Sequence, residues 1–198
     1  YAFSAGGGTV NVNNGEQAKD IQIDGNIGLL KSDLGASIIN INMNTADSYL
    51  NGVIYDEATN EKSELNFTLQ NGAVWTNKLY NTNSNFAGST VRKIVGGSSA
   101  TSAGNIFQND TNKINITNYS GNTNIFYAHE NKGTSADDYI AGDTIIGNAA
   151  VGSNVSLITD NTNINTVRLN EVNQVLNALA GKLTYSAYVD GERNLNGK

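Results

Sequence analysis

The chain has 198 residues and a formal net charge of −6. This acidic balance argues against binding to nucleic acids and against attraction to an anionic membrane, because both interactions need a basic surface. No apolar run approaches the roughly 20 residues that span a bilayer, so direct membrane insertion of this chain is not expected.

The composition favours a thin folded body made of strands. Hydrophobic residues make up 38% of the chain and charged residues only 15%, so Asn, Thr, Ser and 21 Gly supply most of the polarity. Low charge with many β-branched residues is unlike charge-driven disorder. The chain has no proline, which suits continuous hydrogen-bonded strands. It also has no cysteine, which suits a chain that crosses an oxidising compartment while unfolded.

Short apolar segments separated by Asn and Gly predict a series of strands in the first part of the chain. We expect these strands at 10–12, 21–23, 37–43, 53–55, 65–69 and 73–75. The segment 37–43 alternates cleanly, so that Ile39, Ile41 and Met43 share one face and the Asn residues between them take the other. Such a strand buries one face and exposes the other.

Residues 80–110 are the least patterned part of the sequence, and we expect a longer surface loop there. Val91, Ile94 and Val95 are the candidate core residues of this stretch. The pattern resumes after residue 113, where short apolar segments again alternate with Asn, Gly, Ser and Thr. These segments are 114–116, 125–127, 145–146 and 155–158. Each has the length of a strand and is too short for a helix.

Residues 168–181 depart from this style and predict an amphipathic α-helix. Apolar side chains recur there in steps of three and four, at Leu169, Val172, Leu176, Leu179 and Leu183. Gly181 stands where a helix commonly ends, and Asn165 or Thr166 could cap its start. We expect the helix to pack on the side or end of the strand body. The sequence after it predicts a strand at 183–189, a turn at 190–191 and another strand beginning at Leu195.

Together these elements predict an all-β fold, a parallel β-helix whose short strands are wound as coils around one long core. Residues 1–198 would form a single β-solenoid, a segment of a longer chain, with a less regular stretch at 80–110 and a helix near 168–181. Antiparallel hairpins in a sandwich are the main alternative, because Asn-Gly turns suit hairpins as well. In a solenoid, Asn side chains stacked at inward turn positions could bond along the axis as a ladder. Asn-Thr repeats would then mark equivalent corners, at 81–83, 122–124 and 161–163.

Few residues could bind a metal ion or act in acid–base catalysis. His129 is the only histidine, and without a second His or a Cys it is expected to be a surface or turn residue rather than a zinc ligand or general base. Asp137, Asp138 and Asp143 could share a calcium ion. A solvated acidic turn is the simpler interpretation, because the spacing of known calcium-binding loops is not present.

The carboxylate pairs of the chain do not predict a glycoside hydrolase. They are Asp56/Glu57, Glu61/Glu64 and Asp137/Asp138. Catalytic carboxylates face one another across a cleft, whereas neighbours such as these fall in turns or point to opposite faces of a strand. Trp75 and Tyr127 are expected in the core or in ladders between coils. The sequence therefore predicts no catalytic residue, no cofactor and no metal site, and it does not identify the residues that bind a partner.

Two stretches resemble the passenger domains of autotransporters, the type V secreted surface proteins of bacteria, and a third resembles another kind of large bacterial adhesin. The first joins Leu50–Gly52 and the alternating segment 65–69 to Asn71–Trp75. The second begins at Asn118–Gly121, ends near Asp160 and is similar to pertactin-type β-helical coils. The third, 177–183 with 191–195, is similar to a repeat module of large adhesins of anaerobic bacteria. The resemblance implies a right-handed parallel β-helix on the bacterial outer surface that serves adhesion, autoaggregation or biofilm formation.

The expected function is therefore that of a non-enzymatic adhesin segment. It would be extracellular and held at the bacterial surface through parts of the protein outside this sequence. Its partners would be host or bacterial surface proteins or glycans, or other copies of itself, bound by many weak contacts along a stiff rod. A β-helical polysaccharide-degrading enzyme and a purely structural spacer are the alternatives.

Overall fold

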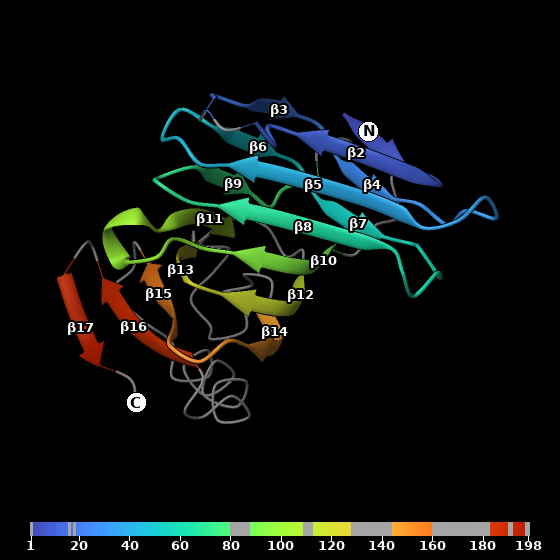
Figure 1. The fold of residues 1–198 in the computed structure, drawn as a ribbon. Coiled ribbons are helices and arrows are strands. Elements are labelled where there is room, and N and C mark those ends of the chain that lie inside the picture. The colour runs from blue at the N-terminus through green and yellow to red at the C-terminus, as the bar shows by residue number, and fades with distance from the viewer. Residues whose placement is uncertain are drawn as a thin grey trace.

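A computed structural model describes residues 2–15, 17, 19–79, 88–108, 113–127, 144–159, 183–189 and 192–196. These residues form an all-β body in which three sheets are wound as a β-solenoid (Figure 1). The described part of the chain contains no α-helix, and its one helical element is the 3₁₀ turn η1 (Ala100–Ser102).

Each sheet collects strands from successive coils. Sheet A has the order β1 (Phe3–Ala5), β4 (Ile27–Leu29) and β7 (Ile54–Asp56). Sheet B has the order β2 (Gly8–Val12), β5 (Ser37–Met43), β8 (Glu64–Leu69), β10 (Gly88–Val95), β12 (Lys113–Ser120) and β14 (Thr144–Ala149). Sheet C has the order β3 (Gln22–Asp24), β6 (Tyr49–Asn51), β9 (Val74–Thr76), β11 (Gly104–Gln108), β13 (Asn122–Tyr127), β15 (Ser153–Thr159), β16 (Leu183–Val189) and β17 (Glu192–Asn196).

The pairing of these strands confirms the parallel solenoid and excludes the sandwich of hairpins for the described strands. The chain visits sheets A, B and C in turn, and β1 to β9 complete this circuit three times. Every pairing between two described strands is parallel except that of β16 with β17, and the two isolated bridges, Gln70 with Ala103 and Gly97 with Asn122, are antiparallel. Side chains in contact between neighbouring coils of sheet B are 29, 26 and 30 residues apart in sequence. The strands expected at shorter intervals are therefore the successive sides of one coil.

Alternating apolar residues line the inside of the coils in rows that run along the axis. Ile39, Ile41 and Met43 of β5 are fully buried, as their spacing predicts. In sheet C one inward row is made by Ile23, Leu50, Trp75, Ile106 and Ile125. No single strand is long enough to bury its own apolar face, so each coil depends on the coils on either side of it.

Trp75 lies at the centre of this core, which confirms the role predicted for it. Its side chain is fully buried, and its ring meets that of Phe67 edge to face, with centroids 5.5 Å apart and 71° between the planes. The indole Nε1 donates a hydrogen bond to the carbonyl oxygen of Gly52 at 2.9 Å. The largest side chain of the chain is thus both packed and fully bonded.

The stretch 80–110, expected to be irregular, contains an eight-residue strand in the middle of sheet B. In this strand, β10, Val91 and Ile94 are buried, but Val95 is half-buried and faces outward beside Thr68. The alternation is hidden in the sequence because two consecutive residues, Arg92 and Lys93, both lie outside the core, and because Ser89 takes a core position. Ser89 is accommodated there by hydrogen bonds: its Oγ accepts from Ile54 N at 2.9 Å and donates to Asn77 Oδ1 at 2.5 Å.

The C-terminal end of the described chain differs from a continued solenoid. The strand expected to begin at Leu195 is β17, which starts at Glu192 and runs antiparallel to β16, so the two form a hairpin. The predicted helix at 168–181, with its cap candidates Asn165 and Thr166, lies outside the described residues. That prediction therefore stays a prediction.

Candidate functional site

The most regular surface feature is a row of Asn side chains across the outer face of sheet B. We call it the amide row; it consists of Asn11, Asn40, Asn66, Asn118 and Asn148, with Lys93 in register between the third and the fourth. Asn40 Nδ2 donates to Asn11 Oδ1 at 2.8 Å, and Asn66 Nδ2 donates to Asn40 Oδ1 at 2.9 Å. The row crosses all six strands of the sheet.

The strand pattern explains why these amides face solvent. In β5 the residues Ile39, Ile41 and Met43 point inward, as do Leu65, Phe67 and Leu69 of β8. The residues between them, such as Asn40 and Asn66, must therefore point outward. Each amide carries two N–H donors and two acceptor lone pairs, and a row contact uses one of them. Some of these groups also bond to neighbouring residues, as Asn66 Nδ2 does to Glu64 Oε2 at 3.0 Å. Where a donor or acceptor is not used in this way, it can contact a ligand with hydroxyl or amide groups, and Lys93 adds one positive charge.

Other Asn side chains hold the coil corners together. Asn13 and Asn71 adopt left-handed backbone, with φ of 56° and 54°. Asn13 Nδ2 donates to the carbonyl oxygen of Asn42 at 2.9 Å, and Asn71 Nδ2 donates to that of Asn44 at 3.0 Å. The predicted axial ladder therefore exists, but it lies on outward strand positions, whereas the corner amides bond to backbone carbonyls of the neighbouring coil.

The outer face of sheet C carries a second, mixed surface. Phe107 and Phe126 are half-buried and stack in register, with ring centroids 4.5 Å apart and 6° between the planes. Beside them, Asn124 Nδ2 donates to Asn105 Oδ1 at 2.9 Å. Each ring covers one face of the other, so the aromatic pair is first of all a packing contact between coils.

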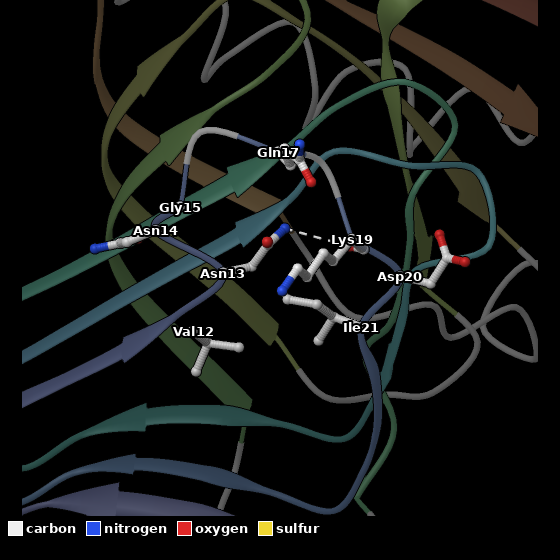
Figure 2. Close-up of a pocket in the computed structure, with 8 residues that line it drawn as sticks. All are labelled: Val12, Asn13, Asn14, Gly15, Gln17, Lys19, Asp20 and Ile21. Atoms are coloured by element: carbon white, nitrogen blue, oxygen red, sulfur yellow. Dashed lines mark hydrogen bonds between the residues drawn. The ribbon is translucent and has the colours of Figure 1, made fainter.

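A pocket of about 760 Å³ opens beside the connection between β2 and β3 (Figure 2). Val12 and Ile21 provide its apolar lining, and Asn13, Gln17, Lys19 and Asp20 are among its polar residues. Asn13 Nδ2 donates to the carbonyl oxygen of Lys19 at 3.3 Å across this connection. The pocket does not gather the residues of a catalytic or metal centre.

The carboxylates considered from the sequence do not meet across a cleft within the described residues. Asp56 is bound by Arg92, while Glu57 and Glu61 are exposed, and Glu64 accepts a hydrogen bond from Asn66 Nδ2 at 3.0 Å. Among the residues that the structure describes, no group of three or more His, Asp or Glu is placed to hold a metal ion. His129, Asp137, Asp138 and Asp143, and the side chain of Tyr127, lie outside the described part.

Arg92 is a clamp on the loop that joins β7 to β8. Its Nε donates to Asp56 Oδ2 at 2.6 Å, its Nη2 donates to Asp56 Oδ1 at 3.2 Å and to the carbonyl oxygen of Ala58 at 2.9 Å, and its Nη1 donates to that of Ser63. The side chain of Arg92 is 25% exposed and that of Asp56 10% exposed. The charges of Arg92 and Asp56 thus compensate one another, and the two carbonyl oxygens accept from Arg92. None of these groups is free to bind a ligand.

Removing this clamp should loosen the loop without unfolding the solenoid. We expect Arg92→Ala to lower the free energy of unfolding by about 1–3 kcal/mol, because Asp56 and the two loop carbonyls lose their charged donor while half-buried. Chemical denaturation measures the loss, and limited proteolysis should locate new cleavage between residues 57 and 63. Lys93→Ala, one residue away and exposed, is the control and should change the stability little.

Tyr119 lies near the end of β12, where the chain passes from sheet B to β13 of sheet C. It is buried, its Oη lies 2.8 Å from Thr123 Oγ1, and it donates to the carbonyl oxygen of Asn154 at 2.7 Å. Burial raises the pKa of the Tyr119 phenol above its ordinary value, and the hydrogen bonds with Thr123 offset this only in part. The hydroxyl therefore stays protonated and structural.

Two further findings concern membrane-spanning helices and similarity to known proteins. No helix in the described part is long and apolar enough to cross a membrane. No family model, no curated protein and no solved structure matches this sequence or fold.

Proposed function

We propose that the chain is an adhesin segment of a secreted bacterial surface protein, and that the outer face of sheet B is its contact surface. The observation that carries this proposal is the amide row, which repeats one chemical group in register on five of the six strands of sheet B, with Lys93 on the sixth. An uncharged cell-surface glycan fits this chemistry best, because amides donate to and accept from hydroxyl groups.

Repetition on a rigid support favours binding by many weak contacts. The amides of Asn11, Asn40 and Asn66 are held by one another, so little side-chain entropy is lost when a ligand engages them. Strands in a sheet lie about 4.8 Å apart, so a long ligand can reach several amides at once. Affinity then grows with the number of amides engaged rather than with the strength of one contact.

The resemblance to autotransporter passengers supports the finer points of the proposal. We infer right-handed coils, since parallel crossovers of one sheet strongly prefer that hand. We also infer that residues 168–181 form an amphipathic helix against the body. Display outside the cell is consistent with a chain without cysteine, and local contacts between coils allow folding to propagate from one end.

A binding array tests the contact surface directly. The purified chain is offered to immobilised glycans and surface proteins, together with the double variant Asn40→Ala/Asn66→Ala. We expect neutral glycans among the ligands and a loss of tenfold or more in the variant, because two adjacent amides leave the row. The matched control is Asn105→Ala/Asn124→Ala, which removes an equivalent bonded amide pair from sheet C. Equal losses in both variants would contradict a contact surface on sheet B.

Two measurements separate the proposal from its alternatives. Turnover of a polysaccharide panel that a single carboxylate substitution abolishes would identify an enzyme. Unchanged cell aggregation after deletion of this segment from its parent protein would identify a spacer. The adhesin proposal expects no turnover and reduced aggregation.

A further inference from the structure

The members of the amide row are spaced by the distance between strands. Asn11, Asn40 and Asn66 occupy matching positions on β2, β5 and β8, which Figure 1 shows side by side. Parallel strands of one sheet lie about 4.8 Å apart, so the row offers a hydrogen-bonding side chain at this interval along the solenoid axis. The bonds of 2.8 and 2.9 Å between these side chains hold them at that interval. A ligand that bonds several of them at once must repeat its own polar groups at nearly the same distance.

The bonding groups that remain in the row suit hydroxyl groups. Asn40 uses one Nδ2 proton to bond Asn11 and one lone pair of Oδ1 to accept from Asn66. An amide has two of each, so one donor and one acceptor of Asn40 remain without a bond to any described residue. A sugar hydroxyl both donates and accepts and can use the two together, whereas an ionised carboxylate can use only the donor. Lys93 within the row and Glu64 beside it carry opposite charges, which gives a charged ligand no net advantage.

A second outward row supports a ligand that lies along the axis. It stands two residues farther along the strands than the amide row and consists of Asn42, Thr68, Val95 and Ser120, in register with one another. Two residues of a strand advance the chain by about 7 Å, so the two rows run side by side at that distance. The four side chains are half-buried, and three of them are short. A flat polymer that lies along the axis can therefore contact both rows over its whole length.

The interval between strands distinguishes between classes of polymer. An extended polypeptide advances by about 3.3 Å per residue, so its polar groups lose their match with the amides within a few strands. Chains of α-1,4-linked or β-1,3-linked sugars coil, and their hydroxyl groups turn away from a straight row. A β-1,4-linked pyranose chain is an extended ribbon that advances by nearly the strand interval per sugar and carries polar oxygens along both edges. Of these polymers, only this ribbon keeps one sugar opposite each strand.

We propose that the ligand of the amide row is an unbranched, uncharged β-1,4-linked polysaccharide that lies along the solenoid axis with one sugar opposite each strand of sheet B. The inference rests on the proposed function and narrows its ligand to one class of glycan. At β10 the ammonium group of Lys93 takes the place of an amide and donates to a hydroxyl group. Each further sugar adds one weak contact, because the next polar side chain stands one strand farther along. The affinity therefore depends on both the length and the linkage of the glycan.

Oligosaccharides of defined length and linkage test this proposal. The purified chain is titrated calorimetrically with cello-oligosaccharides and N-acetylchito-oligosaccharides of two to six sugars. Malto-oligosaccharides and laminari-oligosaccharides of the same lengths are the α-1,4-linked and β-1,3-linked controls. We expect the affinity for at least one β-1,4-linked series to rise tenfold or more from two to six sugars, because each added sugar reaches a further strand. The control series should gain less than about threefold.

Asn40→Ala shows whether these contacts lie along the row. It should weaken binding of the six-sugar β-1,4-linked ligand by about fivefold or more, because that ligand must pass residue 40. A two-sugar ligand can bind at Asn118 and Asn148 instead and should lose little. Lys93→Ala breaks no hydrogen bond within the described residues, so it is the second variant if Asn40→Ala does not fold, and a similar loss is expected. Asn105→Ala, on sheet C, is the matched control and should leave the affinities unchanged.

The possible outcomes separate this inference from the proposed function. If neutral glycans bind through the row without preference for the β-1,4 linkage, or if the affinity does not grow with length, the inference is wrong and the adhesin proposal stands. If folded Asn40→Ala and Lys93→Ala variants bind the six-sugar ligand as well as the unchanged chain does, the contacts lie elsewhere and both are contradicted. If no series binds, the inference is overturned, and the binding array with surface proteins tests the proposed function separately.

Discussion

Trp75→Ala should lower the free energy of unfolding by about 3–5 kcal/mol, the usual range for removal of a fully buried large aromatic side chain. The side chain fills the inward row between Leu50 and Ile106, so its loss leaves a cavity that touches three coils. It also leaves the carbonyl oxygen of Gly52 without the donor at 2.9 Å. Urea unfolding followed by far-UV circular dichroism measures the change.

Trp75→Phe and Phe107→Ala are the matched variants. Trp75→Phe keeps most of the apolar volume but loses the indole donor, so an intermediate loss is expected. Phe107→Ala removes an aromatic ring that is only half-buried on the outer face of sheet C, and it should cost less than Trp75→Ala. If Trp75→Ala proved as mild as Phe107→Ala, Trp75 would not lie at the centre of the core.

Gly52→Ala should destabilise the chain by about 3 kcal/mol or more, because overpacking against backbone cannot be relieved by a rotamer change. A Cβ atom at this position would lie 2.2 Å from the carbonyl oxygen of Gly25 and 2.7 Å from its carbonyl carbon. Both atoms belong to the backbone of the preceding coil, so two coils would have to separate. Thermal unfolding measures the effect as a large fall in Tm.

Gly15→Ala is the control for this prediction. No heavy atom lies within 4 Å of a Cβ built at Gly15, so its substitution should change the free energy of unfolding by less than about 0.5 kcal/mol. If Gly52→Ala were tolerated as well as Gly15→Ala, the two coils would have to lie farther apart at Gly52 than they do in the structure.

Most of the strands could be predicted because the apolar residues that alternate in the sequence are also the residues that are buried in the fold. In β5 and β8 every second residue is buried, and apart from Ser37 these buried residues are apolar, while Ile38 is the one apolar residue on the outward positions. β10 was not predicted because two features break its apolar pattern. Ser89 takes a buried position through hydrogen bonds although it is polar, and Arg92 and Lys93 both lie outside the core, which shifts the alternation by one residue. Core positions filled by bonded polar residues leave no hydrophobic signal.

The amide row could not be found from the sequence, although each of its residues was visible there. Which Asn residues align depends on the length of every coil, and neighbouring row members are separated by 29, 26 and 30 residues rather than by one fixed period. A strand was expected at β17, but its antiparallel direction was missed for a related reason, since the sequence of a strand does not state the direction of its partner. Which strands pair, and in which direction, depends on contacts between coils. The strand propensity of a short sequence contains no information about these contacts.

Pulsed electron–electron double resonance measures distances between pairs of spin labels, and labels placed along the amide row test the parallel stacking of the strands of sheet B most directly. The chain has no native cysteine that would also be labelled. Labels are attached to cysteines that replace Asn11 together with Asn66, Asn118 or Asn148. The separation should rise by about 4.8 Å for each strand crossed, so that the backbone positions of residues 11 and 148, five strands apart, lie about 24 Å from one another. Distances that do not grow in this order would show that the six strands are not stacked in register, and the solenoid would be wrong.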